Sequence, residues 1–239
     1  MQHKHSLALL LGIAAVCPAH AEDQKKPGQW HSSIEIGFVS TSGNTETESL
    51  NLKASTATER EKWRQKLGAT VLKASDANQT TAEKYTLSGK SDYKLQKPTY
   101  LFATINYEDD RFSGFDYQAS EAVGYGWRVI EQKTLELDLE IGPGARQSRL
   151  NNGQTDSEGL LRLGANLDWQ VSETSKFAEA FSVEAGENST ISKSESSLTS
   201  QVNSRMSMKL SLTLKHNSDV PPGVNSMDRE TSATLVYSF

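Results

Sequence analysis

The stretch Leu135-Glu-Leu-Asp-Leu-Glu-Ile141 alternates apolar and acidic residues at every position. Successive side chains of a β-strand point to opposite faces, so this pattern predicts a strand with one apolar face and one charged face. A helix would distribute the same acids around its whole circumference. The period of two recurs from Leu161 to Trp169 and from Met208 to Leu214, and less regularly from Lys84 to Leu95. The chain is therefore expected to consist of strands that separate an apolar from a polar environment.

Turn-forming residues between such runs divide the chain after residue 29 into about twelve strands, with no convincing long helix. Strands of globular proteins usually have ~5–6 residues, whereas a tilted strand needs ~9–11 residues to cross a bilayer. Most of the expected strands reach the second length, which favours a membrane barrel. They cover residues 30–41, 46–58, 63–74, 82–95, 99–110, 116–130, 134–147, 155–171, 176–187, 192–204, 207–217 and 227–239.

The connections between the expected strands alternate in length. Outer-membrane barrels have short turns at the periplasmic rim and longer loops at the extracellular rim. We therefore predict an all-β fold, a transmembrane antiparallel β-barrel of about twelve strands of the bacterial outer-membrane type. The tight turns are expected at residues 96–98, 131–133 and 172–175, and the longer polar connections at 109–115, 148–155, 186–191 and 218–226.

The composition excludes one way of crossing a membrane. The 239 residues are 36% hydrophobic and 23% charged, with a formal net charge of -5. Beyond residue 17 the sequence contains no run of the ~20 apolar residues that a membrane-spanning helix requires. A barrel remains compatible with this composition, because only alternate residues of its strands face lipid. The excess of acids argues against nucleic acid as a partner.

The first 21 residues have the three parts of a secretory signal peptide. Residues 1–5 are basic, Leu7 to Val16 are apolar, and Ala19-His-Ala21 matches a cleavage site. We expect residues 1–21 to be cleaved, which leaves residues 22–239 as a single outer-membrane β-barrel domain. Cleavage would also remove the single cysteine and three of the five histidines. Neither a metal site nor a cofactor is therefore expected.

The last strand ends in an aromatic residue with apolar residues at alternate positions before it. Leu235, Tyr237 and Phe239 share one face of this strand. This pattern is recognised by the machinery that assembles bacterial outer-membrane barrels. We therefore expect the cell outer membrane as the location, with the barrel assembly machinery and outer-membrane lipids as partners.

Aromatic residues gather at the strand ends beside the expected periplasmic turns. Rings with one polar edge favour the headgroup level of a bilayer. The pattern therefore predicts an aromatic girdle at this rim. Its expected members are Trp30, Trp63, Trp127, Trp169, Phe177 and Tyr237.

Several short motifs occur together over the whole length after the signal. They are Gly37-Phe38 with Ser42-Gly-Asn-Thr-Glu46, Tyr107-Glu-Asp-Asp-Arg111 with Tyr117, Gly142-Pro-Gly144, and Pro221-Pro-Gly223. In these motifs the chain resembles the YdiY-like family of salt-induced outer-membrane proteins, which is built on a domain of unknown function. The resemblance implies an outer-membrane β-barrel but no known substrate or reaction. A link to salt or envelope stress rests on the family name alone.

The polar face of the strands is expected to line the barrel lumen. If the strands pair through their short turns, Arg128 lies opposite Glu136 and Glu140 opposite Arg162, within two residues. Asp138 would then lie between the inward glycines Gly126 and Gly164, in an open stretch of wall. These charges form either a solvated, ion-paired filling or a cation-preferring constriction around Asp138. The candidate lumen residues are Arg128, Glu136, Asp138, Glu140 and Arg162.

The expected function is a narrow passive pore or a structural envelope protein, and not an enzyme. One alternative is an outer-membrane lipid hydrolase, because His216 and Ser218 resemble the catalytic dyad of outer-membrane phospholipase A. A second alternative is a soluble periplasmic β-barrel that binds a ligand. Two acids fit the lipid-facing phase badly, Glu121 and Glu179, because a charge facing the bilayer is costly. For Glu121 the sequence leaves open a bulge that shifts the phase or a contact with another subunit, and the oligomeric state is likewise open.

Overall fold

The computed structural model describes residues 28–42, 47–76 and 79–239, and in this part of the chain it contains twelve strands. The predicted strand ranges agree with the observed ones to within three residues at each end. The described residues contain no helix that is long and apolar enough to cross a membrane. The expected signal peptide lies outside the described residues. The strands are β1 (Trp30–Ser42), β2 (Thr47–Glu59), β3 (Trp63–Asp76), β4 (Gln79–Lys94), β5 (Thr99–Asp110), β6 (Phe115–Glu131), β7 (Leu135–Leu150), β8 (Thr155–Gln170), β9 (Ser175–Gly186), β10 (Thr190–Gln201), β11 (Met206–Asn217) and β12 (Met227–Ser238).

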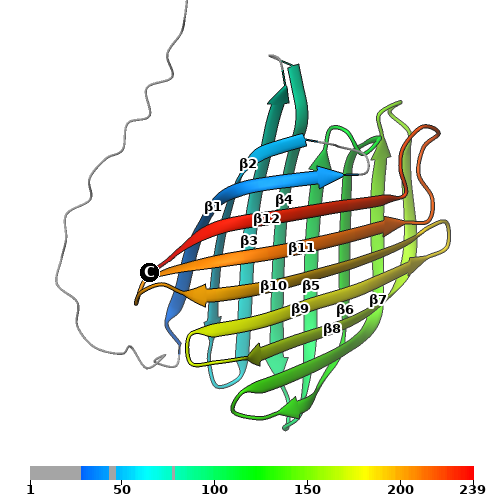
Figure 1. Cartoon of the computed structure of the whole chain (residues 1–239). Helices are drawn as coiled ribbons and strands as arrows, with labels where there is room; N and C mark the ends of the chain where they lie inside the picture. Colours follow the sequence, from blue (N-terminus) through cyan, green and yellow to red (C-terminus); the bar gives the residue numbers. More distant parts are fainter. Residues whose placement is uncertain (1–27, 43–46, 77–78) are drawn as a thin grey trace, which may run out of the picture.

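The sheet closes on itself. Each strand pairs antiparallel with its neighbours in the sequence, and β12 completes the circle by pairing with β1 (Figure 1). In this last pair Ile36 lies opposite Leu235, and Ser33 lies opposite Ser238. A closed barrel leaves no strand edge unpaired, which a structure within lipid requires.

The distribution of residues is the reverse of that in a water-soluble domain. Large apolar side chains are exposed on the outer surface, such as Ile105 (60%), Val123 (58%) and Leu210 (58%). Charged side chains are buried inside, among them Asp92 and Arg146. An exposed apolar face around a polar interior suits a barrel surrounded by lipid. The predicted transmembrane antiparallel β-barrel is therefore confirmed.

The two rims of the barrel differ less in loop length than the sequence suggested. The terminal rim, where β1 begins and β12 ends, carries the connections 60–62, 95–98, 132–134, 171–174 and 202–205. The described connections at the opposite rim are 111–114, 151–154, 187–189 and 218–226, and of these only the last is long. The expectation of several long loops there is wrong, because polar strand ends continue the ladder. Arg149, for example, still pairs with Thr155 on β8.

An aromatic girdle surrounds the terminal rim, as predicted. Trp30, Trp63, Trp127, Trp169 and Tyr237 are all between 43% and 50% exposed, and Phe177 is half-buried beside Trp169. Toward the opposite rim, the rings of Tyr107 and Tyr117 stack with centroids 5.8 Å apart. Trp127 and Tyr117 lie ten residues apart on β6, which is about 25 Å along the axis of a tilted barrel. We call the outer surface between these two levels the apolar belt.

Candidate functional site

The half of the lumen nearer the terminal rim contains a connected set of ion pairs on the β3–β7 wall. Arg64 Nε donates to Asp92 Oδ2 at 2.6 Å, and Arg64 Nη2 donates to Asp138 Oδ2 at 3.0 Å. Arg128 Nε donates to Asp138 Oδ1 at 2.7 Å and Arg128 also contacts Glu136 at 3.1 Å. Asp138 is thus held by two guanidinium groups. Its charge is neutralised within the wall.

This geometry corrects the expected surroundings of Asp138. In the β6–β7 ladder Arg128 lies opposite Asp138 rather than Glu136. The slip of two residues is within the range that the sequence allowed, but it changes the neighbours. Glu140, and not Asp138, lies between Gly126 and Gly164. The expectation of an open stretch of wall around Asp138 is therefore wrong.

Glu140 is also paired, and one of its partners is an aromatic side chain. It forms an ion pair with Lys90 and accepts a hydrogen bond of 2.8 Å from the Tyr100 hydroxyl. The Tyr100 ring occupies the space above Gly126, where an added Cβ would come within 2.2 Å of the ring. Tyr100 also packs with Phe102 and Ala122 in a small buried cluster. The inward glycine therefore makes room for an aromatic side chain that narrows the lumen.

A vestibule of about 830 Å³ opens inside the terminal rim. Its lining contains eight Lys or Arg side chains and five Asp or Glu side chains, and Asp92 and Glu140 behind it compensate further cations. Lys66 lies directly opposite Lys90 in the β3–β4 ladder and two residues from Arg64. Among the described residues Lys66 has no hydrogen bond or ion pair. This wall of the vestibule therefore carries a lysine that has no direct acidic contact among the described residues.

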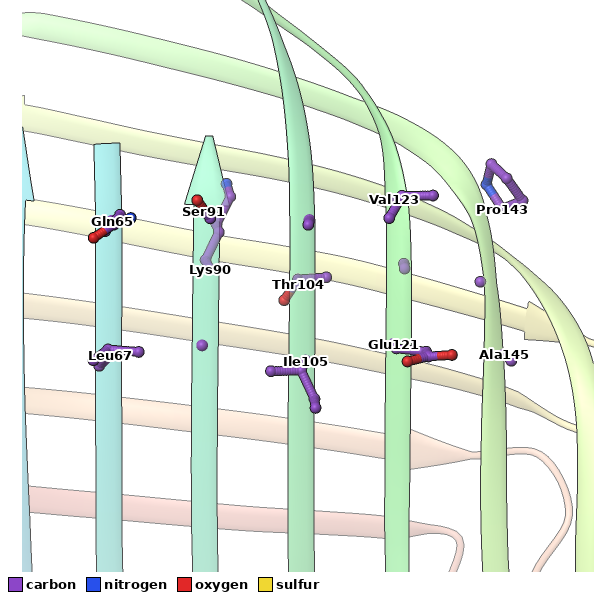
Figure 2. A pocket seen from close by; sticks show the side chains of 14 residues that line it. Gln65, Leu67, Lys90, Ser91, Thr104, Ile105, Glu121, Val123, Pro143 and Ala145 are labelled. Atoms are coloured by element: carbon purple, nitrogen blue, oxygen red, sulfur yellow. The ribbon is translucent and has the colours of Figure 1, made fainter. Parts of the chain in front are cut away.

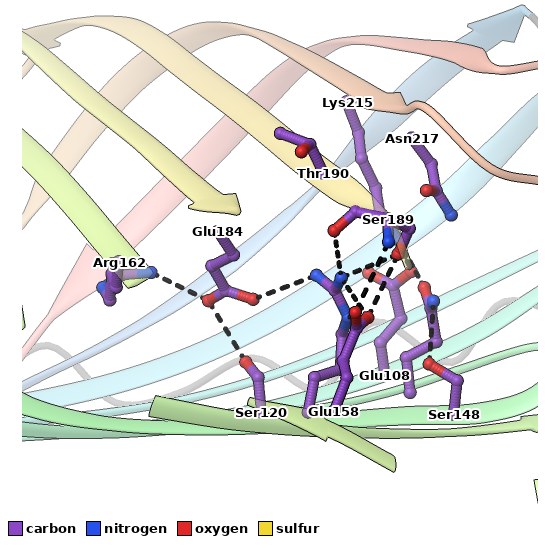
Figure 3. Close-up of polar contacts among 12 residues, drawn as sticks. Glu108, Ser120, Ser148, Glu158, Arg162, Glu184, Ser189, Thr190, Lys215 and Asn217 are labelled. Atoms are coloured by element: carbon purple, nitrogen blue, oxygen red, sulfur yellow. Dashed lines mark hydrogen bonds and ion pairs between the residues drawn. The ribbon is translucent and has the colours of Figure 1, made fainter. Parts of the chain in front are cut away.

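Toward the opposite rim, one ion pair bridges the lumen. Lys215 Nζ of β11 lies 2.5 Å from Glu108 Oε1 of β5 and donates to Gln118 Oε1 of β6 at 3.2 Å (Figure 3). Strands β5 and β11 are six strands apart in either direction around the barrel. Lys84 of β4 approaches the second oxygen of Glu108 at 3.6 Å. The two walls are thus joined by side chains at this level.

A second cluster lies beside this bridge on the β7–β9 wall. Arg146 Nη2 contacts Glu158 Oε1 at 2.5 Å and donates to Ser189 Oγ at 2.7 Å (Figure 3). Arg162, predicted opposite Glu140, instead lies opposite Gly142 and donates to Glu184 Oε1 at 3.0 Å. Arg146 is nearly fully buried. The cluster fixes the connection 187–189 to the barrel wall.

All five candidate residues face the interior, but the sequence reasoning missed several partners. The alternation of inward and outward residues along the strands could have identified these partners. Glu108 lies within one of the motifs that carry the family resemblance, and Lys215 continues the inward phase of Lys209, Ser211 and Thr213. The missed residues are Arg64, Lys66, Lys90, Asp92, Glu108, Arg146 and Lys215.

The proposed catalytic dyad is not joined in the structure. His216 is exposed, and no hydrogen bond between it and Ser218 occurs among the described residues. The Ser218 hydroxyl instead accepts a hydrogen bond of 2.8 Å from the Thr190 amide. A serine nucleophile needs an adjacent base, and this serine caps a connection at the opposite rim.

The terminal strand presents its apolar alternate residues outward. Leu235, Tyr237 and Phe239 are 46%, 43% and 65% exposed, and the last two rings lie 6.1 Å apart. The Phe239 amide donates to the Ser32 carbonyl at 2.9 Å, which ties the chain end to β1.

Comparison with known proteins agrees with this architecture. The model of the family described as "Protein of unknown function, DUF481" matches residues 34–239. The chain belongs to this family. The uncharacterized protein YdiY of Escherichia coli (strain K12) is 26% identical to this DUF481 protein over 216 residues, which are 90% of this chain and 84% of YdiY. The predicted family resemblance is therefore confirmed.

Solved structures that resemble this DUF481 protein include bacterial porins. The NanC porin has a TM-score of 0.58 at 9% identity, over 85% of this chain and 98% of its own. The KdgM porin, solved in complex with disordered oligogalacturonate, has a TM-score of 0.50 at 12% identity, over 87% of this chain and 99% of its own. At such identities the likeness shows the fold alone. That fold is the barrel of outer-membrane porins and channels.

Proposed function

We propose that this DUF481 protein is a narrow passive pore of the outer membrane with a moderate preference for small anions. The observation that carries the proposal is Lys66, a lumen cation with no hydrogen bond or ion pair among the described residues, opposite Lys90 and two residues from Arg64. An uncompensated charge on a low-dielectric wall concentrates ions of opposite sign. The KdgM porin, solved with an acidic oligosaccharide, supports an anionic solute class.

The proposal includes an orientation and two kinds of partner. The terminal rim faces the periplasm, because both ends of the barrel segment lie there, and lipids contact the apolar belt. Leu235, Tyr237 and Phe239 are the signal for the barrel assembly machinery. The fold supports this location, because closed barrels with apolar outer faces are the strand-built way to span a bilayer.

Reversal potentials in planar bilayers across a KCl gradient test the anion preference. The wild-type pore is expected to pass chloride more readily than potassium, and Lys66→Glu to shift the ratio toward potassium. Lys97→Glu is the matched control, because Lys97 lies in a turn at the same rim and its side chain is 84% exposed. A potassium-selective wild type, or an unchanged ratio in Lys66→Glu, contradicts the proposal. Folded protein that forms no channels favours the structural envelope role.

A further inference from the structure

Glu121 projects from the apolar belt, and no bulge accounts for it. It lies opposite Ile105 on β5 and Ala145 on β7, in regular stretches of both ladders. The irregularities between β6 and β7 lie elsewhere, at Phe115/Tyr117 and at Arg128/Ile130. Glu121 therefore shares the outward face of β6 with Val123, between the levels of Trp127 and Tyr117. The sequence left open a bulge that shifts the phase or a contact with another subunit, and the regular register excludes the bulge.

The two outward acids differ in their partners. Glu179 accepts a hydrogen bond of 2.6 Å from Ser194 Oγ and a second one from Ser196 Oγ, so its carboxylate is satisfied within the barrel wall. Glu121 is exposed and makes no hydrogen bond or ion pair with any residue that the structure describes. A carboxyl group that faces hydrocarbon without a partner is costly. Lipid chains supply no such partner.

Glu121 lies in a recess of the outer wall with a volume of about 750 Å³ (Figure 2). Small residues on β4, β5 and β7 line the recess, namely Gly89, Ala103 and Ala145, and Leu67 and Ile105 add apolar surface. Lys90 also borders the recess, but its ammonium group binds Glu140 inside the barrel. The recess therefore combines one carboxyl group with a surface that allows another backbone to approach closely.

The ladder beside the recess lacks some of its hydrogen-bonded pairs. The β6–β7 ladder pairs Ala122 with Gly144 and Tyr125 with Ile141, and no pair joins the residues between them. Pro143 lies in this gap and has no N–H group to donate. The register is the same on both sides of Pro143, so the wall is continuous there, and the proline ring adds apolar surface to the recess beside Glu121.

We propose that the recess is the interface of a two-fold symmetric homodimer in which the Glu121 side chains of two copies meet. A two-fold axis along the membrane normal keeps every residue at its own depth, so a residue near the axis meets its own counterpart. Two carboxyl groups that share a proton satisfy one another. A second copy thus supplies the missing partner at the correct depth, covers the Pro143 segment and fills the recess.

The test combines cross-linking in isolated outer membranes with the mass of the purified full-length protein. The only cysteine is Cys17, within the expected signal peptide, so single cysteines can be introduced. Ala145→Cys is expected to cross-link to a dimer with a short bis-maleimide. Leu210→Cys is the matched control, because Leu210 is equally apolar, 58% exposed, and on β11 across the barrel.

Light scattering in detergent is expected to give twice the mass of one chain for the wild type. Ala145→Trp, which fills the recess, and Glu121→Leu, which removes the carboxyl group, are expected to give one chain, while Glu121→Gln remains dimeric. Heat-modifiable migration on gels shows that each variant is folded. A monomeric wild type, equal cross-linking at residues 145 and 210, or cross-linking of residue 145 to a different protein would each overturn the homodimer.

Discussion

Lys215 on β11 and Glu108 on β5 form an ion pair of 2.5 Å across the lumen, although their strands lie on opposite walls of the barrel. Their side chains are only 15% and 19% exposed. Any solute that crosses the lumen must pass this pair. On the proposed pore function, this bridge and not the acids that the sequence singled out is the expected constriction.

Removal of the Lys215 and Glu108 side chains is expected to widen the proposed pore. The double variant Lys215→Ala/Glu108→Ala removes both charges together, so that neither is left unpaired, and it should raise the single-channel conductance in planar bilayers. The control Lys176→Ala/Asp168→Ala removes an ion pair of 2.5 Å at the wide terminal rim. Equal conductance of the wild type and the lumen-bridge variant would show that the constriction lies elsewhere.

Asp138→Asn is expected to increase the preference for anions. The substitution leaves Arg64 and Arg128 without the carboxylate that both contact, so the wall gains net positive charge. Glu136→Gln should change the ratio less, because Glu136 contacts Arg128 alone and its side chain is 45% exposed. Reversal potentials measure both variants. A shift of Asp138→Asn toward cations would contradict the assigned pairing.

Gly126→Ala is expected to destabilise the barrel. An added Cβ would lie 2.2 Å from the Tyr100 ring, and overpacking of this kind costs about 1–3 kcal/mol of unfolding free energy. The matched change is Gly159→Ala on β8, where nothing lies within 4 Å. Denaturant unfolding in detergent micelles compares the two variants. If both variants unfold at the same denaturant concentration, the position of the Tyr100 ring does not require a glycine at residue 126.

Removal of the terminal ring is expected to impair assembly more than stability. Phe239 is 65% exposed and packs only against Tyr237 among the described aromatic rings, so Phe239→Ser should lose little folding free energy once assembled. It should nevertheless reach the outer membrane at a lower level than the wild type, while Phe239→Tyr retains the level. Quantitative blots of outer-membrane fractions measure this. Equal levels of Phe239→Ser and wild type would argue against the terminal residue as a signal.

The sequence predicted the strands well, because their determinants are local. Alternation from Leu135 to Ile141 specifies both faces of β7, and turn residues limit its neighbours. The five candidate lumen residues face inward for the same reason. Their neighbours were less accessible, because the β6–β7 register depends on the exact turn and on the bulge between Arg128 and Ile130, and Arg128 pairs with Asp138, two residues from the expected position. A displacement of two residues keeps every side chain on its own face, so the alternation of polar and apolar residues does not reveal it.

The sequence by itself thus determined that a barrel forms, how many strands it has and which face of each strand is polar, because strand periodicity is a property of consecutive residues. Only the tertiary structure decided which polar residues meet. Glu108 and Lys215 are 107 positions apart in the chain, and their contact depends on closure of the barrel and on the width of its lumen. Glu121 was visible in the sequence as a misfit, but its regular register, its recess and its lack of a partner in the described part of the chain emerged only from the assembled wall.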